Sequence, residues 1–196
     1  MAYPSVAAPY GLVPVRMVNG SPYNGAMRHY KIASGYNTAI FNGDAVKLVT
    51  GGTVERDAAD AAMTPIGVFL GCSYTDPDMG LVFRNSYPAG TVADDITAFV
   101  CDNTDVLFKV AIVSSGTTIG DMAQTDVGAN VAMVDNTGVT ATGKSQIAAS
   151  DTSATTNTLP LRIVGLVEET KNASGGYTEA LVKWNAGHAL SSTTGI

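Results

Sequence analysis

The sequence predicts a mainly β protein: an antiparallel β-barrel or sandwich with an extended N-terminal arm and little helix. The apolar runs are short and are separated by Gly, Asp and Asn turn residues, as in chains built from many short strands. Charged residues make up 14% of the 196 residues and there are 21 glycines, whereas an average chain is about 25% charged. Four prolines in the first 25 residues exclude a helix there.

Strand-like runs occur in four pairs, and each pair flanks a short turn that predicts a hairpin. The pairs are 44–49 with 53–56, 66–75 with 81–87, 96–102 with 106–113, and 161–169 with 177–185. Their regular spacing is typical of an antiparallel barrel or sandwich. Helix is expected at most in two weak segments, 56–63 and 118–124.

The chain is expected to form one β domain over residues 26–188, with a short C-terminal tail at 189–196. A Ser-, Thr-, Asn- and Gly-rich stretch at about 135–160 predicts a long surface excursion. Residues 1–25 are interpreted as an interaction arm, because they are apolar and aromatic yet cannot form a core of their own; a disordered terminus is the alternative. The arm residues expected to bind a partner are Tyr3, Pro4, Pro9, Tyr10, Leu12, Val13, Val15 and Tyr23.

Charge and hydropathy exclude two classes of partner. The net charge is −6 with a pI near 4.7, and the 11 Lys and Arg residues are scattered along the chain and form no basic stripe, so nucleic-acid binding is not expected. No window approaches 18 consecutive apolar residues, and the proline-broken start lacks the basic region of a signal peptide. A membrane-bound protein is therefore not expected either.

Residues 138–145 match the G-x-x-x-x-G-K-S pattern of a nucleotide-binding P-loop. That loop must lead into a helix, whose N-terminus binds phosphate. Here the motif is followed by Ser, Thr, Asp and Asn residues and then by Pro160, which disfavour a helix. The sequence therefore predicts a hairpin tip with Lys144 in solvent and no nucleotide cofactor.

Other candidate catalytic and metal-binding residues are isolated along the chain. Cys72 and Cys101 lie in apolar runs and are interpreted as buried free thiols, with a disulfide in an oxidising environment as the alternative. His29 and His188 are expected to face solvent, and the Asp-rich stretch at 76–80 is expected to be a plain turn. We therefore expect no catalytic, cofactor or metal site, and a protein that is not an enzyme.

Several phrases together resemble a known family. They include "PYGLVPVR", "YKIASGYNTAIFNGDAVKLV", "VFRNSYPAGTVADDITAFVCDN" and "ALVKWNAGHAL", within a similarity that runs from about residue 8 to residue 190. In these phrases the chain is similar to a family of small structural proteins of tailed bacteriophages, encoded near the major capsid protein. The role that this resemblance implies is that of a head decoration or cement protein.

The resemblance implies a virion protein on the capsid exterior, assembled in the host cytoplasm, whose partner is the major capsid protein. It further implies a homo-oligomer, with a trimer favoured and a dimer possible. A tail, head–tail connector or receptor-binding component of the virion is the alternative.

Overall fold

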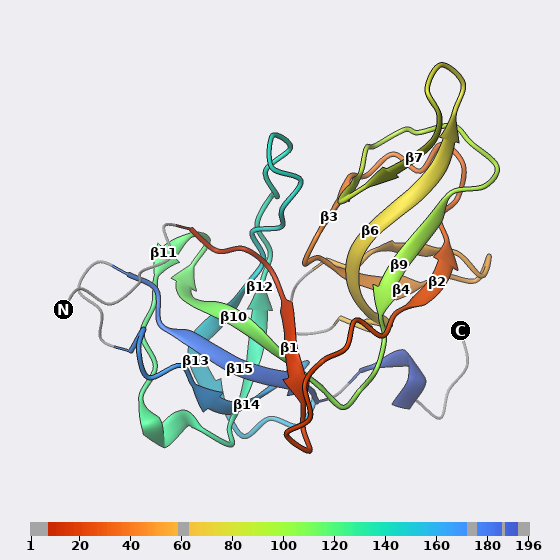
Figure 1. Cartoon of the computed structure of the whole chain (residues 1–196). Helices are drawn as coiled ribbons and strands as arrows, with labels where there is room; N and C mark the ends of the chain where they lie inside the picture. The colour runs from red at the N-terminus through yellow and green to blue at the C-terminus, as the bar shows by residue number, and fades with distance from the viewer. Residues whose placement is uncertain (1–7, 59–62, 172–175, 186, 192–196) are drawn as a thin grey trace.

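The protein is mainly β, with strands arranged in a barrel and in a second group of two sheets (Figure 1). The computed structural model describes residues 8–58, 63–171, 176–185 and 187–191. Helical structure in these residues is confined to two 3₁₀ turns, η1 (Gln124–Asp126) and η2 (Ala189–Ser191). The predicted fold class is confirmed, and the two weak helix candidates form no α-helix in their described parts.

The barrel consists of five strands and is closed by the pairing of β10 with β15. Its order is β10-β13-β12-β14-β15, and β15 pairs again with β10. Every pairing in this circuit is antiparallel except that of β10 with β13. Two further strands, β1 and β11, pair with β10. The strands are β1 (Val13–Met17), β10 (Val106–Ser115), β11 (Thr118–Ile119), β12 (Asn130–Val134), β13 (Ala148–Ala154), β14 (Leu161–Leu166) and β15 (Glu179–Trp184).

The second group contains a six-stranded antiparallel sheet and a small two-stranded one. The larger sheet has the order β2-β9-β6-β4-β5, and β7 pairs with the far end of β6. Its strands are β2 (Arg28–Lys31), β4 (Ala45–Leu48), β5 (Val54–Arg56), β6 (Gly67–Asp76), β7 (Gly80–Arg84) and β9 (Thr97–Cys101), while β3 (Ile40–Phe41) pairs with β8 (Ser86–Tyr87).

Each group has its own apolar core. Phe108, Trp184 and Leu161 are among the large side chains buried in the barrel, and Phe69, Tyr87 and Ile66 are buried beneath the six-stranded sheet. Burying side chains of this size is worth about 1.5–3 kcal/mol each. The barrel core also includes side chains from β4, β6 and β9 of the six-stranded sheet, so the two groups of strands share part of their packing.

Three of the four predicted hairpins are present: β4 with β5, β6 with β7, and β14 with β15. The prediction that 96–102 and 106–113 pair is wrong. β9 lies between β2 and β6 in the six-stranded sheet, and β10 is bonded to barrel strands on both of its edges. Neither strand has an edge left for the other, so the turn between them is the crossing from one sheet to the next.

Candidate interaction surface

The outer face of the six-stranded sheet carries large apolar side chains. Side chains alternate between the two faces of a strand, so Tyr74 and Val82 pack toward the core while Leu81 and Phe83 point the other way. Leu81 is 62% exposed and Phe83 is 70% exposed. Exposed groups of this kind mark protein-binding surfaces in soluble proteins.

Three rings from three strands form a row on this face. The ring centroids of Phe83 and Phe99 lie 6.3 Å apart in a stacked arrangement, and those of His29 and Phe99 lie 5.1 Å apart. The row therefore runs from β7, across β6, to β9 and β2. Such contacts hold the rings in place before any partner arrives, which lowers the entropy cost of binding. We call His29, Leu81, Phe83 and Phe99 the outer apolar face.

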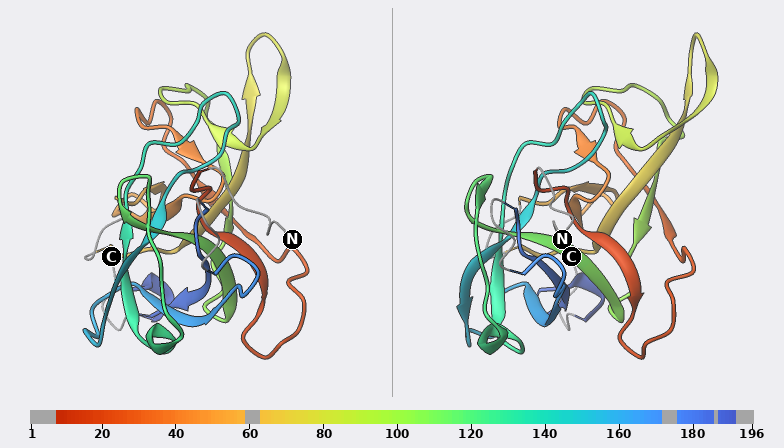
Figure 2. Two further views of the ribbon diagram at one scale, coloured as in Figure 1. Left: turned by 90° about the vertical axis from the view of Figure 1, so that its left-hand side faces the viewer. Right: turned by 60° about the vertical axis from the view of Figure 1, so that its left-hand side comes forward.

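The hairpin that joins β6 and β7 stands clear of the rest of the molecule (Figures 1 and 2). Its turn is held by Asp76, whose Oδ1 accepts hydrogen bonds from the backbone N–H groups of Asp78 and Met79. Gly80 has φ +77°, a conformation that a side chain disfavours. The turn expected at 76–80 is present, and it presents Met79, which is 62% exposed, at the tip.

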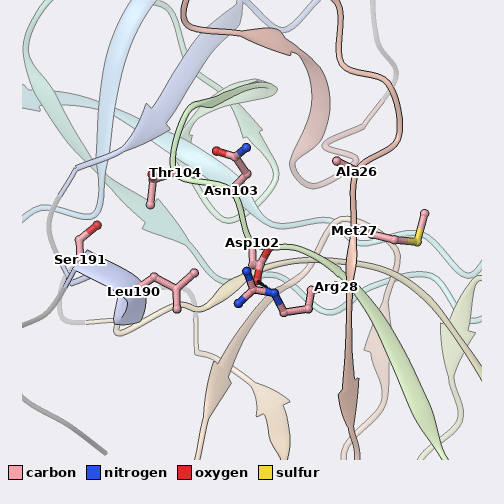
Figure 3. A pocket seen from close by; sticks show the side chains of 8 residues that line it. All are labelled: Ala26, Met27, Arg28, Asp102, Asn103, Thr104, Leu190 and Ser191. Atoms are coloured by element: carbon pink, nitrogen blue, oxygen red, sulfur yellow. Dashed lines mark ion pairs between the residues drawn. The ribbon is translucent and has the colours of Figure 1, made fainter.

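A separate cavity of about 480 Å³ opens between the start of β2, the end of β9 and η2 (Figure 3). At its centre Arg28 Nε lies 3.1 Å from Asp102 Oδ2. Tyr30 Oη donates to the same oxygen at 2.7 Å, and burial together with this bond raises the pKa of Tyr30 to about 12. One oxygen of the Asp102 carboxylate is therefore already bound by two side chains of its own chain.

A buried polar cluster joins the barrel to the six-stranded sheet. Asp44 is fully buried and accepts hydrogen bonds from Ser145 Oγ at 2.5 Å, from the Phe41 N–H at 2.8 Å and from Arg56 Nε at 3.1 Å. Arg56 also pairs with Asp135. Burial raises the pKa of the Asp44 carboxyl, although these hydrogen bonds and the charge of Arg56 oppose the shift. We call Asp44, Arg56, Asp135 and Ser145 the junction cluster.

The segment 135–147, which we call the strap, leaves β12 of the barrel and runs across to the other sheets before returning as β13. Its Gly143 O accepts the Asn42 N–H at 3.0 Å, and its Ser145 N–H donates to Asn42 O at 2.9 Å. Asn85 Nδ2 donates to Thr142 O at 2.9 Å. The strap covers the first half of the predicted surface excursion. The prediction is wrong for residues 148–154, which form β13 and pair with β10 and β12 in the barrel.

The P-loop pattern lies within the strap and is not followed by a helix. Residues 145–147 are irregular and lead directly into β13, and the Ser145 hydroxyl, which would have to hold Mg²⁺, is bonded to Asp44 instead. Lys144 is exposed, as predicted. In this structure the residues of the P-loop pattern connect the barrel to the second group of sheets.

Replacing Lys144 with Ala should leave the protein unchanged, because the side chain lies in solvent. Its melting temperature should stay within about 1 °C of wild type, as expected for a surface substitution. Titration calorimetry with Mg–ATP should show no binding at millimolar nucleotide. Tight binding that Lys144→Ala abolishes would restore the nucleotide hypothesis.

The described part of the predicted arm packs on the barrel of its own chain. Pro9 and Leu12 are buried, and Leu12 belongs to the barrel core at 1% exposure. Val13 starts β1, which pairs with β10, and Tyr10 Oη donates to Glu179. The interpretation of residues 8–17 as an arm separate from the domain therefore needs correction: they complete the domain.

The other arm residues differ in position. Val15 is 37% exposed on β1; Tyr23 is half-buried, packs against the barrel core and donates from its hydroxyl to Ala26 O. Tyr3 and Pro4 lie outside the described residues. The structure thus does not gather the predicted partner-binding side chains on one free surface. The outer apolar face was missed because the alternation in "LVFR" puts Leu81 and Phe83 on one face without indicating which face is covered.

Both cysteines are buried and free, as predicted, but His188 is not in solvent. It is 1% exposed and lies against Trp184, with ring centroids 5.8 Å apart. Burial lowers the pKa of His188. The error arose because its Gly- and Ser-rich sequence context resembles a tail. His29 is exposed as expected.

We expect both thiols to resist modification in the folded protein. Burial raises the pKa of Cys72 to about 11 and also raises the pKa of Cys101, so little reactive thiolate forms near neutral pH. A chromogenic disulfide reagent should react with the native protein far more slowly than with protein unfolded in guanidinium chloride. Rapid release of colour from the native protein would contradict this.

Comparison with known proteins gives no relative: no family model, no curated protein and no solved structure matches the chain. Among the described residues no group of three His, Cys, Asp or Glu side chains could hold a metal ion. None of the helices in the described ranges is long and apolar enough to cross a membrane.

Proposed function

We propose that the protein is a structural protein of a tailed-bacteriophage virion, a head decoration or cement protein that binds the assembled shell of the major capsid protein from outside. The observation that carries the proposal is the outer apolar face, where Leu81 and Phe83 are more than 60% exposed on a hydrogen-bonded sheet. A face of this kind binds other proteins. The resemblance described above supplies the class of partner.

The mechanism is stabilisation by binding. A protein that contacts neighbouring shell subunits only when they are correctly assembled lowers the free energy of the assembled state, and the gain rises with its concentration. Repeated attachment around a symmetric shell adds avidity. Two sheet groups fastened by the strap and the junction cluster suit this role, because a rigid connector loses little entropy on binding.

The experiment is co-sedimentation of the purified protein with expanded, undecorated shells, followed by a melting curve of the particles. The protein should pellet with shells at a fixed stoichiometry and raise their melting temperature. Isolated tails serve as the matched control. Binding to tails and not to heads would support the tail or connector alternative, and binding to neither would refute the proposal.

A further inference from the structure

β7 is an edge strand with a free hydrogen-bonding side. It pairs with β6 along its whole length, from Asp76 opposite Gly80 to Cys72 opposite Arg84. Within the described ranges it pairs with no other strand, and no backbone hydrogen bond joins it to another segment. Open edges with apolar side chains invite a further strand, and natural proteins usually protect them with charges, prolines or bulges. The five residues of β7 contain no proline, and their single charge is at the end.

The strand is complementary to itself. If two copies of β7 pair antiparallel about Val82, Leu81 of each copy lies opposite Phe83 of the other. All four of these side chains are on the outer face, so two identical apolar cross-strand pairs form. Each such pair contributes about 0.2–1 kcal/mol. In a two-fold interface between identical subunits, each contact occurs twice with the two residues exchanged, as Leu81 and Phe83 are here.

Charges at the two ends of β7 complement each other in the same register. Arg84 is exposed at one end, and the acidic turn that carries Asp76 and Asp78 lies at the other. Antiparallel pairing brings Arg84 of one copy opposite Gly80 of the second, beside that turn. Opposite charges then meet at both ends of the joint, which favours this register over a slipped one.

We propose that two copies of this chain associate through β7, which pairs antiparallel with itself about Val82 and joins two six-stranded sheets into one. The projecting hairpin carries the strand away from the body of the molecule (Figure 2), so the edges meet before the barrels do. The rows of rings on the two copies then lie on the same side of the joined sheet. This inference goes beyond the proposed function, since it concerns the free protein, and it favours a two-fold contact over the trimer that the resemblance implies.

Sedimentation equilibrium of the full chain over a range of concentrations tests the association. Wild-type protein should show a reversible monomer–dimer equilibrium, and Phe83→Lys should weaken it by about 100-fold, because it removes both apolar pairs and brings in two charges. The control is Val92→Lys, a change at a 77% exposed apolar residue outside β7, which should not alter the equilibrium. Unchanged melting curves would show that both variants fold. A wild-type protein that stays monomeric, or equal weakening by both variants, would overturn the proposal.

Cysteine pairing tests the register. A mixture of Leu81→Cys and Phe83→Cys proteins should form a disulfide-linked heterodimer on mild oxidation, because directly opposed residues of paired strands have Cβ atoms about 4.5–5.5 Å apart. Val92→Cys mixed with Phe83→Cys is the control and should not cross-link efficiently. Equal cross-linking in the two mixtures would contradict the pairing. Binding to shells is measured in a separate experiment. Absence of the dimer therefore does not contradict the proposed function, and absence of shell binding does not contradict the dimer.

Discussion

Deletion of residues 2–17 should prevent the barrel from folding, whereas deletion of residues 2–7 should not. The longer deletion removes β1, which pairs with β10 along its length. It also removes Leu12 from the barrel core and the Tyr10 hydroxyl from Glu179. Losing a buried leucine side chain alone costs about 2–5 kcal/mol, and a domain of this size has about 5–15 kcal/mol of stability in total.

Soluble yield, far-UV circular dichroism and thermal melting measure this effect. The 2–17 deletion is expected to be insoluble or to lack a cooperative transition, and the 2–7 deletion should melt like wild type. If the longer deletion instead melts within a few degrees of wild type, β1 is dispensable and residues 8–17 act as an arm after all. The same 2–7 deletion, tested on shells, shows whether Tyr3 and Pro4 contribute to binding.

Local patterns predicted three of the four hairpins correctly, because each of these hairpins is specified by residues close together in the sequence. The "TGG" turn between β4 and β5 and the "DPDMG" turn between β6 and β7 fix their pairings within a few residues. The β9–β10 error shows the limit of this reasoning: a short turn between two apolar runs looks the same whether the runs pair or enter different sheets. Whether two such runs pair with each other depends on which other strands, distant in the sequence, occupy their edges.

The junction cluster and the outer apolar face could not be predicted for the same reason. Asp44 and Ser145 are 101 residues apart in the chain, and nothing local marks Asp44 as buried. Gly11 illustrates the same dependence, since a Cβ there would lie 2.7 Å from Ser145 Cβ and 2.8 Å from Gly43 O. Three distant segments meet at this glycine. In a chain of which only 14% is charged, this junction gathers three charged residues, Asp44, Arg56 and Asp135, in two ion pairs.

Replacing Arg56 with Ala should destabilise the protein by about 3–5 kcal/mol, because removing one partner leaves the other as an uncompensated buried charge. The guanidinium bonds Asp44 at 3.1 Å, pairs with Asp135 and donates to Asn136 O at 3.3 Å, so it fastens the start of the strap to β5. Asp44→Ala should cost a similar amount, since it also leaves the Ser145 hydroxyl and the Phe41 N–H without their acceptor.

Urea unfolding of the single and double variants distinguishes this mechanism from simple loss of packing. The double variant, Asp44→Ala with Arg56→Ala, should be less destabilised than the sum of the two single changes, because neither charge remains alone. Asp135→Ala is the matched control: its side chain is 42% exposed, so it should cost no more than about 1 kcal/mol. Strictly additive losses in the double variant, or an Asp135→Ala loss as large as that of Asp44→Ala, would show that Asp44 and Arg56 do not act as a compensated buried ion pair.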